Sequence, residues 1–195
     1  SKSPRGFFGA VPILSLLALA TLCVVAFTLC PMQADDSEAA GKYDFVADGF
    51  KYKIISETEK TVSLIGPVNP PTSPTPLALR GEATNESTTY TVTIIGDSAF
   101  KEMEYYTGGI EIPTSVKTIG DYAFYKCSGF SGTLTSMVTE KIGNSAFSEC
   151  SGFTGSLNLQ SINSIGDLAF RDCSGFTGGL TLPSSITGIG DYAFI

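Results

Sequence analysis

The sequence contains no histidine. This absence excludes Ser-His-Asp and Cys-His catalysis, histidine general bases and histidine metal ligands together. An enzyme built from this chain would have to use carboxylates, lysine, tyrosine or cysteine. Carboxylates such as Glu102, Glu104 and Glu111 could imitate a glycosidase pair, but no pattern in the sequence pairs them. We identify no catalytic, cofactor-binding or metal-ligating residue and predict that the protein is not an enzyme.

Basic residues are scarce as well. The chain has 12 lysines and arginines against 19 aspartates and glutamates, a net charge of −7. Beyond residue 30 the net charge is −9, because Lys2 and Arg5 are lost and 10 basic residues face 19 acidic ones. A nucleic-acid binder needs a basic face, so this balance predicts no nucleic-acid partner and fits an exposed, solvated surface.

Charge is missing altogether from residues 7–29. As a helix, these 23 residues would rise about 35 Å, enough to cross a hydrocarbon core of about 30 Å. Lys2 and Arg5 precede the segment and acidic residues follow from Asp35. This asymmetry places the N-terminus inside the cell and the rest of the chain outside.

Residues 1–34 are therefore predicted to be a signal peptide or a transmembrane anchor. Three fates remain open: cleavage after Ala34, retention in the membrane through residues 7–29, or a lipoprotein modification at Cys30. Each of the three places residues 35–195 outside the cytoplasm.

Residues 35–76 are predicted to hold a β-hairpin entry module and a proline-rich linker. Apolar and polar residues alternate around Asp48-Gly49, a pair that accepts the positive φ of a type I′ turn. Residues 61–65 are a further strand candidate. The five prolines between residues 66 and 76 donate no backbone hydrogen bond, which favours an extended loop or linker.

From residue 77 the chain repeats itself. The phrase Ile-Gly-(Asp/Asn)-x-Ala-Phe occurs five times, and its phenylalanines are spaced 24, 23, 23 and 24 residues apart. A period between 20 and 29 is typical of leucine-rich repeats. One such unit cannot bury its apolar side alone, so the units must stack. The repeated phenylalanines are Phe100, Phe124, Phe147, Phe170 and Phe194.

Each column of the repeat has an expected structural role. Apolar-x-apolar segments predict parallel strands near residues 110–112, 134–136, 157–159 and 180–182, although the second segment lacks one apolar residue and its register is uncertain. The Asp or Asn of each phrase is expected to cap a short helical turn, and the preceding Gly to allow a backbone corner. Leu77-Ala78-Leu79 reads as an earlier copy, separated from its Ile95 by an inserted loop near residues 81–89.

The residues LPSSITGIGDYAF and CSGFTGSLNL resemble the BspA-like (Treponema-type) leucine-rich repeats, and DFVADGFKYKIISETEKTVSLIG resembles the module that precedes them. The resemblance covers about residues 43–195. It implies a leucine-rich-repeat solenoid over residues 77–195, in which short parallel β-strands alternate with short helical turns, behind a small β-rich entry module and an N-terminal hydrophobic helix. It also implies an exported bacterial protein, secreted or at the cell surface, that mediates adhesion or binds an extracellular protein or glycan, host matrix included.

The repeated cysteines are expected to be structural. Cys127, Cys150 and Cys173 come one per repeat, with no CxxC pair, so a zinc cluster is disfavoured. We predict buried thiols that pack like small apolar side chains. Disulfides between adjacent repeats stay possible in an oxidising compartment, although three cysteines cannot all pair.

The middle residues of the predicted strands must point away from the core. These residues form a candidate ligand-binding strip of small polar groups that could hydrogen-bond to a partner's backbone or to a sugar. The strip has no aromatic residue and no arginine, so affinity per module should be weak. A plain solvated face, and a spacer that projects a further C-terminal domain, remain the alternatives. The strip residues are Glu111, Thr135, Asn158 and Thr181.

Overall fold

The computed structural model describes residues 43–195 with the exception of Ser136. The signal peptide or anchor predicted at residues 1–34, with its hydrophobic helix at 7–29, lies outside the described residues. Within the described part of the chain, no helix has the length and hydropathy needed to cross a membrane.

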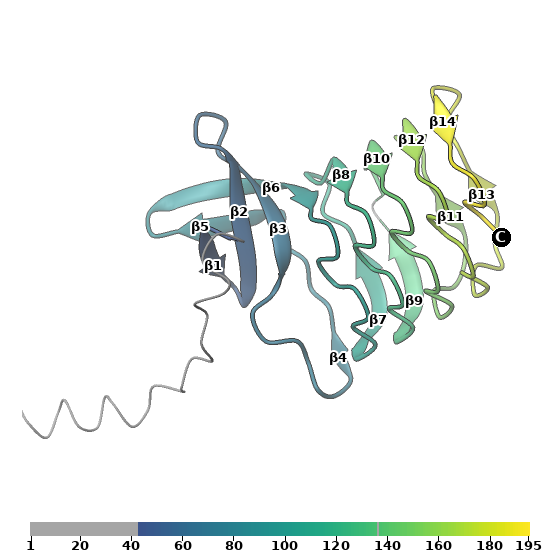
Figure 1. Ribbon diagram of the computed structural model, residues 1–195, viewed down its shortest axis with the longest axis horizontal. Helices are drawn as coiled ribbons and strands as arrows, with labels where there is room; N and C mark the ends of the chain where they lie inside the picture. The colour runs from purple at the N-terminus through teal and green to yellow at the C-terminus, as the bar shows by residue number, and fades with distance from the viewer. Residues whose placement is uncertain (1–42, 136) are drawn as a thin grey trace, which may run out of the picture. The chain divides into compact units, whose positions relative to one another are not determined.

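The entry module is a meander of three strands: β1 (Phe45–Ala47), β2 (Phe50–Ser56) and β3 (Thr61–Pro67) (Figure 1). Strands β1 and β2 pair antiparallel around Asp48 and Gly49, whose φ angles are 48° and 82°. Strand β3 continues the sheet antiparallel to β2. The predicted hairpin and the predicted third strand are therefore confirmed.

A second hairpin occupies the segment where we expected a loop near residues 81–89, so that expectation is wrong. Strand β5 (Glu82–Asn85) pairs antiparallel with the start of β6 (Thr88–Ile95). Ala83 and Tyr90 are paired across the hairpin and both are buried, which gives the segment a core-facing side. The second half of β6 runs parallel to β3, so β6 joins the entry module to the repeats.

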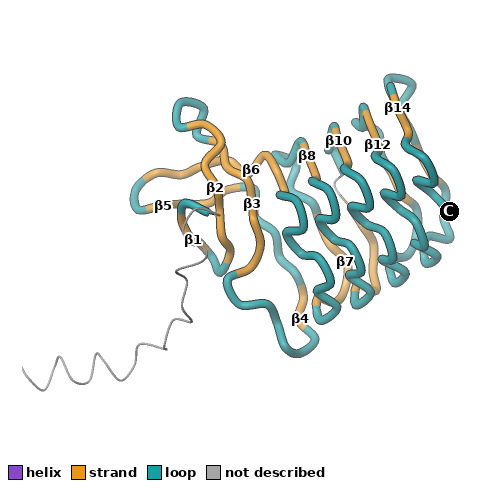
Figure 2. Tube along the Cα trace, in the orientation of Figure 1, coloured by secondary structure: helices purple, strands orange, loops and turns teal. Residues whose placement is uncertain are grey.

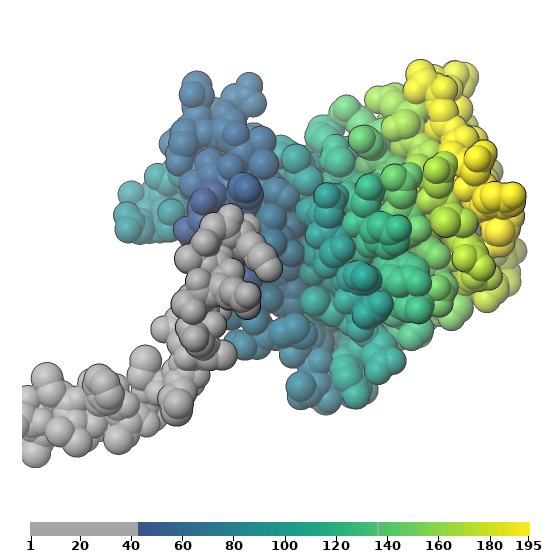
Figure 3. All heavy atoms as spheres, viewed as in Figure 1, coloured from purple at the N-terminus to yellow at the C-terminus, as the bar shows by residue number. Residues whose placement is uncertain are grey.

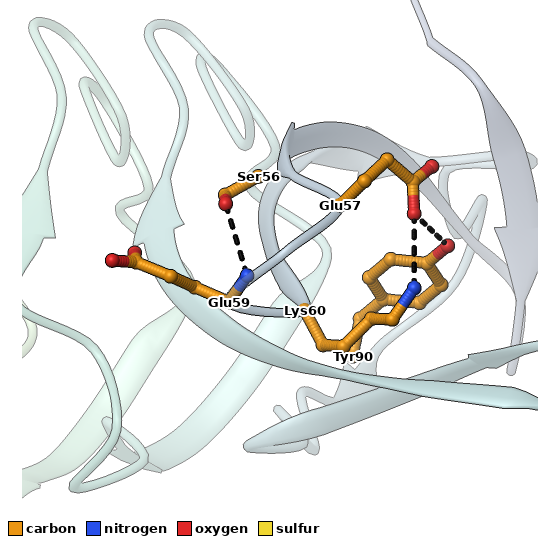
Figure 4. A network of polar contacts seen from close by, with 5 residues as sticks. All are labelled: Ser56, Glu57, Glu59, Lys60 and Tyr90. Carbon is orange, nitrogen blue, oxygen red and sulfur yellow. Dashed lines mark hydrogen bonds and ion pairs between the residues drawn. The ribbon is translucent and has the colours of Figure 1, made fainter.

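A polar network fastens the β2–β3 turn onto β6 (Figure 4). The Tyr90 hydroxyl donates to Glu57 at 2.9 Å, and the Lys60 ammonium lies 3.2 Å from the same carboxylate oxygen. Lys60 also lies 5.4 Å from the centroid of the Tyr90 ring. Within the turn, Ser56 Oγ accepts the N–H of Glu59 at 3.1 Å. The hydrogen bond from Tyr90, followed by that from Lys60, lowers the pKa of Glu57.

Two rows of short parallel strands run through the repeats (Figure 2). The first row continues from β6 through β8 (Thr118–Ile119), β10 (Lys141–Ile142), β12 (Ser164–Ile165) and β14 (Gly188–Ile189). The second row holds β4 (Thr75–Pro76), β7 (Tyr106–Glu111), β9 (Phe130–Thr135), β11 (Leu157–Asn158) and β13 (Leu180–Thr181). Strand β7 pairs parallel with β9, and β11 with β13. The predicted parallel strands are thus confirmed, while the domain boundary at residues 76 and 77 stays a prediction.

The predicted helical turns are wrong for the described residues, none of which is helical. Ser98 and Glu102 have φ angles of 56° and 60°, outside the helical region. The N–H of Ser98 donates to Asp121 at 2.8 Å and that of Phe100 to Ala123 at 2.7 Å, both in the next repeat. The first turn of a helix would leave these N–H groups without an acceptor in the helix, whereas here the next repeat supplies carbonyl acceptors. Stacking onto the next repeat therefore replaces helix formation.

The repeated Asp and Asn side chains also bond to the next repeat, so their expected role as helix caps is wrong. Asp97 Oδ1 accepts the N–H of Asp121 at 2.9 Å, and Asp121 Oδ1 accepts that of Asn144 at 2.7 Å. Asn144 and Asp167 continue the ladder to Asp167 at 2.9 Å and to Asp191 at 2.8 Å. The column is a side-chain ladder that fixes the stacking distance.

The conserved spacing between repeats also explains the glycine before each Asp or Asn. A Cβ on Gly143 would lie 2.7 Å from the backbone nitrogen of Asp121, closer than real Cβ atoms come. The glycine is needed because adjacent backbones approach closely, and not for the backbone corner that we expected. In the space-filling view the repeats lie in direct contact along the stack (Figure 3).

The core of the repeats is built from columns of stacked rings. Successive phenylalanines of the repeated phrase have ring centroids 5.1, 5.1, 5.2 and 5.4 Å apart, with interplanar angles of 8° or less. A second column from the Cys-Ser-Gly-Phe phrases lies edge-on against the first, for example Phe153 against Phe147 at 6.3 Å. The predicted core role is confirmed for Phe100, Phe124, Phe147 and Phe170, which are buried, whereas Phe194 is 39% exposed.

Candidate functional site

The strip predicted from sequence lies on the exposed side of the second row of strands. Its four residues, Glu111, Thr135, Asn158 and Thr181, are all exposed. The strand ladders place Glu111 directly beside Thr135, and Asn158 directly beside Thr181. Thr135 Oγ1 also lies 3.5 Å from the carbonyl oxygen of Ile110. The structure therefore brings the four residues together as two adjacent pairs.

A hollow separates the two pairs, because β9 and β11 belong to different sheets. The hollow measures about 350 Å³ and is lined by Thr135 and Asn158 together with the hydroxyls of Thr133 and Ser156. None of these four side chains is charged. Leu134, Met137 and Val138 line it as well, so the middle of the strip is an uncharged recess with polar and apolar walls rather than a flat sheet face.

The recess follows from the irregular second repeat. In the third repeat the two buried apolar residues, Leu157 and Leu159, lie two positions apart. In the second repeat the buried residues are Leu134 and Met137, three positions apart, so one extra residue must be accommodated. The uncertain register noted in the sequence is therefore a real irregularity, and it interrupts the ladder next to Thr135.

The turns of the first two repeats carry a second exposed surface, which the sequence reasoning missed. The Tyr122 ring packs edge-on against Tyr125 with centroids 5.7 Å apart, and Lys101 Nζ lies 5.9 Å from both centroids. Hydrogen bonding to Tyr125 and the charge of Glu149 hold the pKa of Lys126 above its usual value. Tyrosines at the variable positions of repeated phrases were the available signal, since exposed tyrosine is common at binding hot spots.

The repeated cysteines are free thiols that bond between repeats. Cys127 Sγ donates to the Phe100 carbonyl, Cys150 to that of Phe124 and Cys173 to that of Phe147, each at 2.9 Å. Burial raises the pKa of Cys127 and Cys173 to about 12 and that of Cys150 further. Cys127 and Cys150 are buried as predicted, whereas Cys173 is half-buried. The described residues contain no group of three or more side chains placed to hold a metal ion.

Comparison with known families gives one match that spans most of the repeats. The family described as "BspA type Leucine rich repeat region" matches residues 82–195 in six copies. A comparison with curated proteins found no significant match.

Solved structures of bacterial proteins share the fold. A leucine rich cell surface protein from Faecalibacterium prausnitzii A2-165 has 21% identity and a TM-score of 0.58, over 77% of this chain and 51% of its own. The pneumococcal vaccine antigen PcpA has 23% identity and a TM-score of 0.59, over 77% of this chain and 41% of its own. A leucine-rich repeat protein from Bacteroides capillosus ATCC 29799 has 22% identity and a TM-score of 0.54, over 75% of this chain and 97% of its own. The chain thus spans about half the length of the Faecalibacterium protein.

Proposed function

The chain belongs to the BspA type leucine-rich repeat family, and from this premise we propose that it is an exported, non-catalytic bacterial surface protein that binds an extracellular protein or glycan. The binding face is the strip formed by Glu111, Thr135, Asn158 and Thr181. Two of the fold relatives support a place at the cell surface, since one is named a cell surface protein and the other a vaccine antigen. Residues 7–29 hold the protein in the membrane unless residues 1–34 are cleaved.

The single observation that carries the binding role is the arrangement of the strip. Its residues are exposed, whereas Ile110 and Ile112 on either side of Glu111, and Leu157 and Leu159 on either side of Asn158, are buried in the core. Within each pair the strands lie about 4.8 Å apart, so the side chains of Asn158 and Thr181 are close enough to hydrogen-bond to one partner chain. Such groups can donate and accept hydrogen bonds without the desolvation cost of charges.

Adhesion through this strip depends on multiplicity. Three of its four residues are uncharged, and none is aromatic or arginine, the types that usually dominate binding energy. Each module therefore contributes little, and useful attachment arises from many repeats or many copies, which raise the effective concentration of the next contact.

The test uses beads that display the protein and are screened against matrix proteins and glycans. Lysines introduced together at Thr135, Asn158 and Thr181 should abolish any binding that the unmodified protein shows. The matched control places lysines at Ser128, Ser151 and Ser174, which are exposed in the turns of three repeats and give the same change of charge.

Equal loss in both triple variants would assign the effect to charge, and unchanged binding by the strip variant would move the site off this face. If the unmodified protein binds none of the targets, the alternative is favoured, in which the repeats are a spacer that projects a further C-terminal domain.

A further inference from the structure

A groove of about 990 Å³ lies where the entry strands meet the first repeat, separate from the recess between β9 and β11. One wall is the β5–β6 hairpin, from which Glu82, Thr84 and Thr91 line the groove. Glu82 and Thr91 are direct partners in that hairpin. The opposite wall is β7, which contributes Gly109 and Glu111.

Hydrogen bonds hold the chain before β5 at its two ends, and between them Leu77 is buried in the core while Ala78 and Arg80 are exposed. At one end β4 pairs with β7, Thr75 beside Tyr106. At the other end the Gly81 carbonyl accepts the hydroxyl of Ser115 at 3.3 Å and the N–H of Val92 at 2.8 Å. Among the described residues no ladder joins residues 77–80 to β7. The strand that would continue the second row therefore stays apart from β7 and leaves an open recess.

The lining of the groove is acidic. Asp48, Glu82 and Glu111 come from three different elements, and Arg80 is the one base among the described residues that line it. Arg80 Nε lies 3.3 Å from Asp48 Oδ2, with both side chains more than half exposed. Such an exposed pair is weak and can exchange partners. The lining therefore carries a net charge of −2 on a chain whose part beyond residue 30 carries −9.

We propose that this junction groove binds an extended, lysine- or arginine-bearing segment of a partner protein. The acidic lining attracts the basic side chains, and the hydroxyls of Thr91 and Thr114 bond to the backbone of the segment, since those of Thr84 and Ser115 already bond to Thr89 and Gly81. An acidic segment would meet like charge. The site is distinct from the strip, which it touches at Glu111 alone, so either site can fail without the other.

The test measures fluorescence anisotropy of a labelled ten-residue peptide of alternating lysine and threonine, with a glutamate–threonine peptide as its counterpart, against the full chain. The lysine peptide should bind at low salt and the glutamate peptide should not. The double variant Glu82→Gln, Glu111→Gln should weaken binding about tenfold, in keeping with the loss of two charge contacts. The control is Glu102→Gln, Glu140→Gln, which removes two exposed charges outside the groove.

A second variant tests the groove without changing its charge. Ala78 is exposed and lines the groove, so Ala78→Trp should block the peptide and leave the circular dichroism spectrum unchanged. The proposal is supported if Ala78→Trp loses binding and if the double glutamine variant in the groove loses more affinity than the double glutamine variant outside it. It is overturned if the lysine peptide does not bind, if both peptides bind equally, or if the two glutamine pairs lose affinity equally.

Discussion

Thr139 occupies a core column that is otherwise apolar, and its replacement by valine should stabilise the protein. The equivalent residues of neighbouring repeats are Val116, Ile162 and Ile186, each three positions before the Ile of the repeated phrase. Thr139 is 1% exposed, and its hydroxyl has no hydrogen-bond partner among the described residues. The native sequence therefore buries a polar atom where its neighbours bury methyl groups.

The size of the effect follows from the desolvation of that hydroxyl. A buried, unpaired polar group costs about 1–3 kcal/mol, and valine has almost the same shape as threonine without the hydroxyl. Thr139→Val should raise the free energy of unfolding by about this amount. For a chain of this size the melting temperature should rise roughly 2–4 °C per kcal/mol.

Urea unfolding followed by circular dichroism measures the change, and an unchanged slope with denaturant would show that the unfolded state is the same. Thr114→Val is the matched control, since Thr114 is exposed and its loss of a hydroxyl should change stability by less than about 0.5 kcal/mol. Destabilisation by Thr139→Val would refute the reasoning, because it would mean that the hydroxyl makes a hydrogen bond worth more than its burial costs.

Two further predictions concern the columns of the core. Phe147→Ala removes a ring that stacks on Phe124 at 5.1 Å and on Phe170 at 5.2 Å, so unfolding experiments should show a loss of about 3–5 kcal/mol, and a loss under about 1 kcal/mol would contradict the core role. The raised pKa of Cys150 keeps it a protonated thiol near neutral pH, so it should react with a thiol probe only after denaturation. The half-buried Cys173 should react earlier, and mass spectrometry of labelled peptides distinguishes the two cysteines. Rapid labelling of Cys150 in the native protein would contradict its burial.

The repeat architecture could be predicted from the sequence because each column of the repeat has one chemical type. Five phrases in register placed four of the five phenylalanines in the core and predicted the second row of strands, since stacked repeats bury the same position in every unit. The first row, β8 to β14, was not predicted. The hairpin around Asp48-Gly49 could be predicted for a similar local reason, because the turn residues and the alternation agree.

Apart from the loop expected near residues 81–89, where the structure has the β5–β6 hairpin, the predictions that were wrong concern contacts between repeats. Within a single repeat, Asp121 looks like a helix cap for the residues that follow it. Only the structure of the neighbouring repeat shows that its side chain accepts the N–H of Asn144. The same applies to the expected helical turns, whose N–H groups donate to the next repeat. Local propensity cannot report a partner about 23 residues away, so these errors have one physical origin.

Both hollows described above, the recess beside Thr135 and the junction groove, lie at irregular repeats, whereas the core is built from regular ones. Where the same polar residue type occurs in every repeat, its side chain hydrogen-bonds to the next repeat and helps the repeats to stack. The ladder from Asp97 to Asp191 is an example. Open recesses occur where the length or pattern of the repeat is irregular. The three-residue interval before Met137 opens the recess beside Thr135, and the β5–β6 hairpin, inserted before the first full repeat, forms one wall of the junction groove. Irregular units in this array are therefore where ligand contacts should be sought first, because they leave space that the stacked repeats do not fill.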